Sequence, residues 1–211
     1  MIVALIKRDT VRGLRAAGLP VAFFLIAATL FPFAVGPDAK LLASAGGGML
    51  WLAALLAALL PIERLVAPDA DAGVLDQFVV RGLADESVAA AKIVAHWLGF
   101  GPPLMIAALP GAALLGLDMA TLGRLEAGLA IGTPALAALG VTVAALTVGL
   151  RGAGALAGLM LLPLAIPLLI FGAGALRAGD GEAIRLLAAT ALLLTAGAPF
   201  AAGAALRALR D

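Results

Sequence analysis

Long apolar runs separated by short polar segments dominate this sequence. Six of the runs contain no Asp, Glu, Lys or Arg, and each is 21 to 25 residues long. About 20 apolar residues in a helix are enough to cross the hydrocarbon core of a bilayer. The pattern predicts six membrane-spanning segments, at residues 16–37, 41–62, 93–117, 127–150, 152–176 and 186–206.

Composition favours helices for these segments. Charged residues make up 13% of the chain and hydrophobic residues 64%, whereas about a quarter of a typical soluble domain is charged. Backbone amides must be paired inside lipid, and only helices or closed barrels achieve this. The runs lack the alternation of polar and apolar residues that marks barrel strands. We therefore expect an all-α, polytopic membrane protein that forms one domain over residues 1–211.

The distribution of basic residues predicts the orientation. With the amino terminus inside, ten of the fourteen Lys and Arg residues lie in inner segments, and the outer segments hold only Lys40, Arg124, Arg177 and Arg185. This asymmetry follows the positive-inside rule. Both termini are expected to be cytoplasmic.

The first fifteen residues have an amphipathic pattern. Arg8, Arg12 and Arg15 share one face of a helix over residues 2–15, and Ile2, Ile6 and Leu14 lie roughly opposite. Such a helix can lie in the membrane interface, or it can be an ordinary basic flank that only sets topology. Both interpretations stay open.

Residues 63–92 form the only long inner segment between spans and hold six of the thirteen acidic residues. Within this segment, Val74, Leu75, Phe78 and Val79 make one apolar stripe on a short helix, while Asp76 points elsewhere. A helix lying along the membrane can offer a mixed surface to a soluble partner, or the stripe can simply rest on lipid or neighbouring helices. These residues alone favour the second interpretation.

His96 is the only histidine and lies inside the third run, four residues after Lys92. Ionisable residues within spans often have a function. Beside Trp97, near the inner end of the span, His96 is also suited to packing or to anchoring at the interface. Packing is favoured over ligand binding.

The spans lack the motifs of several protein classes. They contain no nucleophile with a base, no HExxH and no midplane carboxylate, so neither a catalytic residue nor a metal ligand set is assigned. No phosphate-binding loop precedes a lysine, so any ATP must be hydrolysed by another chain. The absence of cysteine excludes covalent haem attachment, and a net charge of +1 argues against nucleic-acid binding.

Several segments resemble one known family in order and spacing. They read LFPFAVGPD at 30–38, MLWLAALLAALL at 49–60, AKIVAHWLGFGPPL at 91–104, GTPALAALG at 132–140 and ALTVGLRGAGALAGLMLLPLAIPLLIFG at 145–172. Together they resemble the CcmB family of bacterial cytochrome c maturation.

The resemblance implies an ABC-2-like permease subunit in the bacterial inner membrane, present as a homodimer with the ATPase CcmA and the membrane proteins CcmC and CcmD. It also implies a role in haem export, or in releasing the haem-loaded chaperone CcmE from CcmC. In the export role haem is the substrate, whereas in the release role no haem passes through this chain. No covalently bound cofactor is expected in either role. The rival interpretations are a non-transporting scaffold and a channel or secondary carrier that works alone.

In such permeases a cytoplasmic helix transmits motion from the ATPase. The family pattern resembles DGSLEQL, and AGVLDQF stands here at 72–78 with departures at Ala72 and Val74. The resemblance makes this segment the candidate for ATPase coupling. Its residues are Asp71, Gly73, Leu75, Asp76, Gln77 and Phe78.

Haem iron takes His, Met, Cys or Tyr as axial ligands, and this chain has neither Cys nor Tyr. His96 and Met105 are therefore the weak candidates for haem contact, and both are also suited to packing.

Overall fold

The computed structural model describes residues 1–36, 38–177 and 181–210. The described part of the chain is helical and contains no strand, which confirms the predicted all-α class. The helices in these ranges are α1 (Ile2–Ala16), α2 (Gly18–Val35), α3 (Ala39–Leu59), α4 (Glu63–Asp71), α5 (Val74–Val80), α6 (Asp85–Leu114), α7 (Met119–Thr147), α8 (Ala153–Gly174) and α9 (Gly181–Ala208).

Six helical stretches of the described chain are long and apolar enough to cross a membrane, as the six apolar runs predict. They are α2, α3 with its continuation into α4, α6, α7, α8 and α9.

One helix begins earlier than the charge pattern predicts. The third apolar run starts at residue 93, but α6 already begins at Asp85 and includes Lys92. Asp85 and Glu86 occupy its first turn, where carboxylates interact favourably with the helix dipole. The absence of charge marks the part of a helix suited to lipid, and it does not mark where the helix begins.

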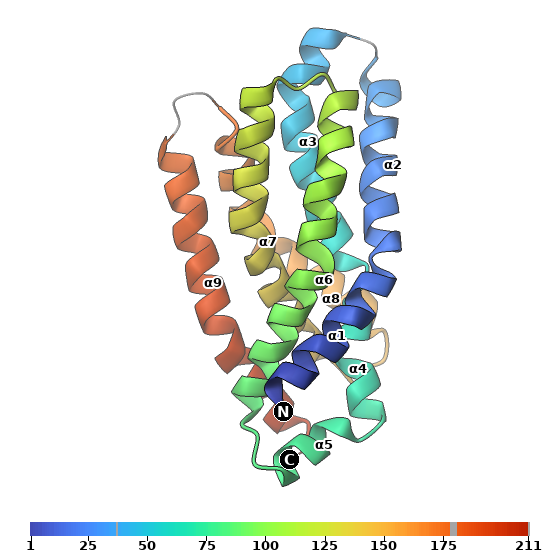
Figure 1. The fold of residues 1–211 in the computed structure, drawn as a ribbon, viewed down its shortest axis with the longest axis vertical. Helices are drawn as coiled ribbons and strands as arrows, with labels where there is room; N and C mark the ends of the chain where they lie inside the picture. Colours follow the sequence, from blue (N-terminus) through green and yellow to red (C-terminus); the bar gives the residue numbers. More distant parts are fainter. Residues whose placement is uncertain (37, 178–180, 211) are drawn as a thin grey trace.

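Figure 1 shows the arrangement of the helices as one elongated bundle. Both termini, α4 and α5 lie at the same end, which we call the termini end. The turns from α2 to α3 and from α6 to α7 lie at the opposite end. At these turns Asp38 and Asp118 cap α3 and α7 by accepting hydrogen bonds from backbone N–H groups.

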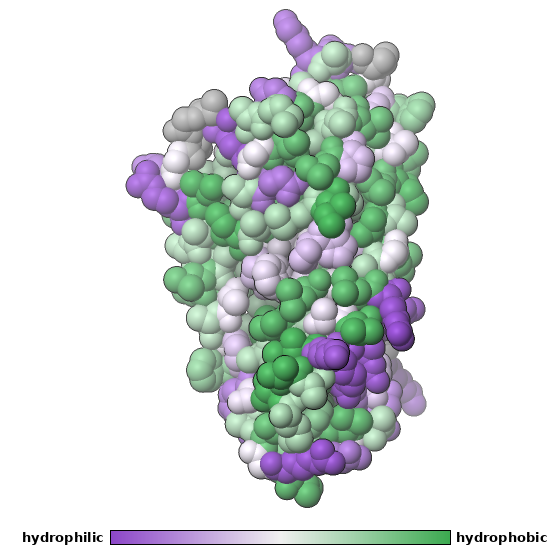
Figure 2. All heavy atoms as spheres, viewed as in Figure 1, coloured by the Kyte–Doolittle hydropathy of each residue, from purple (hydrophilic) through white to green (hydrophobic). Residues whose placement is uncertain are grey.

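The interior is built around α6 and α7, whose small and branched residues are largely buried. In contrast, α2 and α8 carry large exposed apolar side chains such as Ile26, Leu30 and Leu159. An apolar band of this kind on the outside of a bundle suits contact with lipid. Figure 2 shows the part of this band on α2 and, below it, hydrophilic residues that gather beside α1 and at the termini end.

Trp51 fixes the packing of α3 against α7 and α8. Its indole is fully buried against three glycines, Gly128, Gly132 and Gly172. A Cβ at Gly172 would lie 2.5 Å from the indole Cε2, so no larger residue fits there without movement. The pair Gly128 and Gly132 is a GxxxG motif, and here it accommodates one large aromatic side chain.

Candidate functional site

The segment between α3 and α6 forms two short helices, α4 and α5, at the termini end (Figure 1). The break between α4 and α5 lies at Gly73, whose φ of 64° is in the left-handed region that favours glycine. Leu75 is buried and Phe78 is half-buried against the core, whereas Asp71, Asp76 and Gln77 are exposed. An apolar anchor therefore holds α5 with its polar face outward.

The predicted apolar stripe packs on neighbouring helices only in part. Leu75 and Phe78 contact the core, whereas Val79 is 41% exposed and the adjacent Val80 is 86% exposed. A helix of 7 residues touches the bundle along too narrow a strip to cover all four apolar positions. The exposed valines add apolar surface to the free face of α5.

A hollow of about 400 Å³ lies beside α5 and is lined by three of the predicted coupling residues, Asp71, Leu75 and Asp76. Its other side consists of the end of α7, with Val148 and Gly149, and the end of α9, with Leu206, Leu209 and Arg210. The termini end thus presents a polar recess in which several helices meet.

Two ion pairs hold the beginning of α6 to the end of α9 at this end. Arg210 donates to Asp85 at 2.6 Å, and Arg207 pairs with Glu86. Gly203 permits this contact, because a Cβ there would lie 2.9 Å from the Glu86 backbone nitrogen.

Further along the bundle, α1 is tied to α4 and α6 by an ion-pair cluster of five residues: Arg8, Asp9, Arg12, Asp69 and Lys92. Lys92 donates to Asp69 Oδ2 at 2.5 Å and lies 3.3 Å from Asp9 Oδ2. Arg8 also donates to Asp69 at 2.5 Å, and Arg12 lies 3.4 Å from it. Asp69 thus accepts from three cations that belong to two other helices.

The environment of Arg8 stabilises its charge. Partial burial of the guanidinium lowers its pKa, but hydrogen bonds and the negative charges of Asp9 and Asp69 outweigh this effect. The net result is a pKa above the usual value, so Arg8 stays cationic and keeps its ion pairs.

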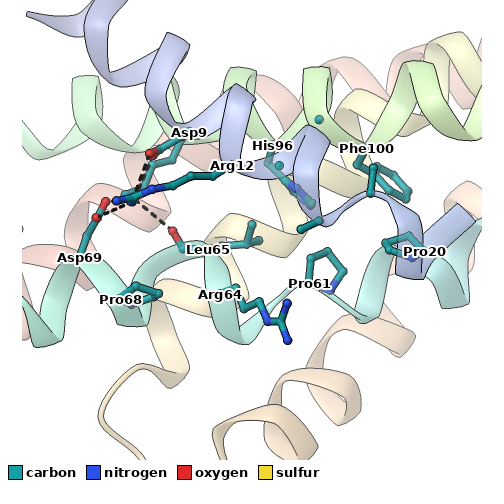
Figure 3. Close-up of a pocket in the computed structure, with 15 residues that line it drawn as sticks. Asp9, Arg12, Pro20, Pro61, Arg64, Leu65, Pro68, Asp69, His96 and Phe100 are labelled. Atoms are coloured by element: carbon teal, nitrogen blue, oxygen red, sulfur yellow. Dashed lines mark hydrogen bonds and ion pairs between the residues drawn. The ribbon is translucent and has the colours of Figure 1, made fainter.

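Behind this cluster lies a pocket of about 370 Å³, which we call the α1 pocket (Figure 3). It opens between α1, α4 and α6, at the point where charged α1 gives way to apolar α2. Its charged residues are Arg64 and four members of the ion-pair cluster, Asp9, Arg12, Asp69 and Lys92. The apolar part of its wall includes Pro20, Pro61, Leu65 and Phe100.

His96 lies on the inner wall of this pocket and stacks on Phe100 with ring centroids 5.6 Å apart. Its Nε2 atom is buried and has no hydrogen-bond partner among the described residues. A Cβ built on Gly140 of α7 would lie 3.5 Å from that nitrogen, so Nε2 is packed against α7. An unpaired buried polar atom costs about 1–3 kcal/mol.

The two weak haem-contact candidates do not share a site in the structure. Met105 is partly buried against the core and is not among the residues that line the α1 pocket. It lies nine positions after His96 on the same helix, which is roughly 14 Å along the axis at 1.5 Å per residue. They are thus not placed as a pair of axial ligands.

Comparison with known proteins identifies the family. The CcmB protein family model matches residues 1–209. The chain belongs to the CcmB family. It is 45% identical to heme exporter protein B of Rhodobacter capsulatus and 46% identical to that of Paracoccus denitrificans, and each match covers 97% of both chains. The protein of the same name from Escherichia coli K12 is 44% identical over 89% of this chain and 88% of its own.

Membership of the CcmB family, together with the six apolar helices, makes this chain a multi-pass membrane protein. Two CcmB segments that carry the resemblance have clear structural roles. The segment at 91–104 contributes Lys92 to the ion-pair cluster and His96 to the α1 pocket, and the segment at 49–60 contributes Trp51 to the core.

Sequence reasoning missed the ion-pair cluster. Asp69 stands in the acidic inner segment at residues 63–92, yet its side chain is 5% exposed. The available signal was the spacing of Lys92 and His96, which places both on one face of a helix. This spacing predicts that the Lys92 side chain faces the protein interior, as His96 does. It does not identify Asp69 as the partner of Lys92.

Proposed function

We propose that this chain is the permease subunit of an ABC-type complex for cytochrome c maturation in the bacterial inner membrane. A partner ATPase of the CcmA type hydrolyses the ATP, and the chain takes part in haem export. The name heme exporter protein B, which the relatives carry, supports haem as the substrate. CcmC and CcmD are further proposed partners, and the chain acts as a homodimer within the complex.

The geometry of α5 is the observation that supports ATPase coupling most directly. Leu75 anchors this helix in the bundle, while Asp76 and Gln77 face outward beside the recess at the termini end. A partner that grips this face moves α5 without needing to enter the bundle. Three further residues complete the proposed coupling segment. Gly73 is the hinge, Asp71 extends the polar surface beside α5, and Phe78 is the second apolar anchor.

A force on α5 can be transmitted to the membrane spans through α4 and its contacts. The two short helices α4 and α5 are joined at Gly73, and α4 continues α3 across the turn at residues 60–62. Asp69 on α4 is bound to Lys92 on α6 and to Arg8 on α1. Movement of α4 therefore reaches the second and third spans and the amino-terminal helix together.

The coupling proposal is tested by reversing charge on the free face of α5. Asp76→Lys with Gln77→Lys should abolish most copurification with the ATPase and most cytochrome c assembly in cells that express the complete complex. Glu182→Lys is the control for the charge reversal at Asp76, because this exposed carboxylate lies at the beginning of α9 at the opposite end. Retained ATPase binding and normal cytochrome c levels in the double variant would refute the proposal.

The orientation is tested independently by cysteine labelling, because the chain contains no native cysteine. Asp76→Cys should react with a membrane-impermeant maleimide only after the inner membrane is opened, whereas Glu182→Cys should react in intact spheroplasts. The reverse pattern would place the termini end outside and exclude contact with a cytoplasmic ATPase.

A second candidate function is transmission of ATP-driven motion to CcmC, with no haem passing through this subunit. The burial of His96 Nε2 against α7 favours it, because the only histidine does not present that nitrogen to the pocket. Haem that copurifies with the complex after deletion of CcmC would support direct export. Its complete absence, with ATPase activity retained, would support the second candidate.

A further inference from the structure

The α1 pocket combines cationic groups with apolar walls at one depth of the bundle. It lies where α1 ends and the charge-free run of α2 begins, so Ala16, Ala17 and Pro20 line it next to Arg12. With the six spans in a bilayer, this boundary falls at the level of the lipid headgroups.

The charges around the pocket do not cancel. The residues that line it include three cations, Arg12, Arg64 and Lys92, and two carboxylates, Asp9 and Asp69, which leaves one positive charge in excess. Arg64 forms no ion pair within the described residues, and its side chain points away from Asp9 and Asp69 (Figure 3). Arg12 remains 59% exposed despite its contact with Asp69. The pocket therefore attracts an anion.

The apolar walls of the pocket indicate that the ligand also has an apolar part. Pro20, Pro61 and Phe100 offer no hydrogen bond from their side chains, so a small hydrated anion would lose water here without replacement. The residues that precede these two prolines in the sequence are also apolar and exposed, Leu60 to 39% and Leu19 to 57%. A ligand with an anionic head and an apolar chain matches both features.

We propose that the α1 pocket binds the headgroup of an anionic phospholipid from the surrounding leaflet. The phosphate lies near Arg12 and Arg64, and the beginning of an acyl chain follows the apolar surface past Leu60. Bound in this way, the lipid bridges α1 and α4 and adds to the cohesion that the ion-pair cluster provides. Basic pockets between membrane helices are a common mode of recognising such headgroups.

The test uses the full-length chain in detergent micelles doped with phosphatidylglycerol, with lipid retention followed by native mass spectrometry. Removing the two cations with Arg12→Gln and Arg64→Gln should weaken retention at least about tenfold, since each basic residue contributes roughly 1 kcal/mol of attraction. The control Lys7→Gln with Arg15→Gln removes the same charge from exposed positions of α1 that are not among the pocket-lining residues. Equal losses in the two double variants would show general surface attraction and overturn the proposal.

Arg12 also contacts Asp69, so the single variant Arg64→Gln tests binding while the ion-pair cluster remains intact. It should lose part of the retention and keep the unfolding temperature measured without lipid. Two further titrations separate the sources of an anion. If inorganic phosphate displaces phosphatidylglycerol at equal concentration, the site takes a soluble anion; if haem displaces it, the site takes a porphyrin. Either displacement would overturn the proposal, and failure of both supports it.

Discussion

Lys92 Nζ lies 2.5 Å from Asp69 Oδ2, and the two side chains are 4% and 5% exposed. The pair joins α6 to α4 between residues 23 positions apart in the sequence. A buried pair of this kind adds little when compared with a well-packed apolar pair, but leaving one partner alone is costly. The pair therefore makes the position of α4 sensitive to any change at either residue.

Asp69→Asn should destabilise the protein by about 3–5 kcal/mol, because Lys92 would keep a buried charge with only Asp9 as counter-ion. The double variant Asp69→Asn with Lys92→Met should recover a large part of this loss. Thermal unfolding of the full chain in micelles measures both effects, and Asp76→Asn serves as the exposed control. An unfolding temperature unchanged by Asp69→Asn would contradict the assigned pair.

Gly13 of α1 and Gly99 of α6 touch backbone to backbone. A Cβ on Gly99 would lie 2.9 Å from Gly13 Cα, so Gly99→Ala must push α1 away from α6. We expect a cost of about 1–3 kcal/mol. Gly18→Ala is the control, because a Cβ on Gly18 meets open space.

The displacement of α1 can also be followed directly. Leu5 is buried, so Leu5→Cys in this cysteine-free chain should react slowly with a maleimide. Combining it with Gly99→Ala should raise the labelling rate several-fold, whereas combining it with Gly18→Ala should not. Equal rates in both backgrounds would show that α1 stays in place.

Gly132 lies at the edge of the Trp51 indole, and a Cβ there would overlap the ring at Cη2. Gly132→Ala should therefore destabilise the bundle by about 1–3 kcal/mol, and Trp51→Leu in the same chain should relieve the overlap. Gly158→Ala in α8 is the matched control, since a Cβ at that position has no neighbour within 4 Å. A larger loss for Gly158→Ala than for Gly132→Ala would contradict the observed packing.

Asp118 caps α7, and its hydrogen bonds with Thr121 hold the pKa of this carboxyl below its usual value. A lowered pKa means that the capping contribution is complete above the unfolded-state pKa, about 3.9, and is lost as the pH falls through the folded-state value. Asp118→Asn keeps a capping side chain but removes the titration, so its stability should depend less on pH below about 4. Unfolding curves of both proteins between pH 7 and pH 3 test this expectation.

The apolar runs predict the six long helices, because lipid imposes a minimum length and excludes charge. The beginning of α6 could not be predicted in this way, since a helix continues into water wherever its turns stay favourable. For the same reason, the apolar runs do not predict which charged residues are buried. Asp69 and Asp76 stand in one acidic stretch, yet only Asp69 is buried, because Lys92 and Arg8 approach it from distant parts of the chain.

Likewise, only part of the candidate site could be predicted from the sequence. The family resemblance points to the segment at 72–78, and its exposed Asp76 and Gln77 are placed where a partner can reach them. The α1 pocket has no signature in the sequence, because it is assembled from residues of α1, α2, α4 and α6 together with the turn at Pro61. His96 was identifiable as unusual, but whether its ring nitrogens face a cavity or a neighbouring helix depends on packing.

The three cations around Asp69 restrict independent movement of the helices that carry these residues. Because α1 and α6 both hold the same carboxylate, α4 cannot tilt away from either of them without exchanging ion-pair partners. These three helices are thus expected to travel as one rigid block. Bending is then left to the joints at the edges of this block, of which Gly73 is the nearest to the surface proposed for ATPase contact.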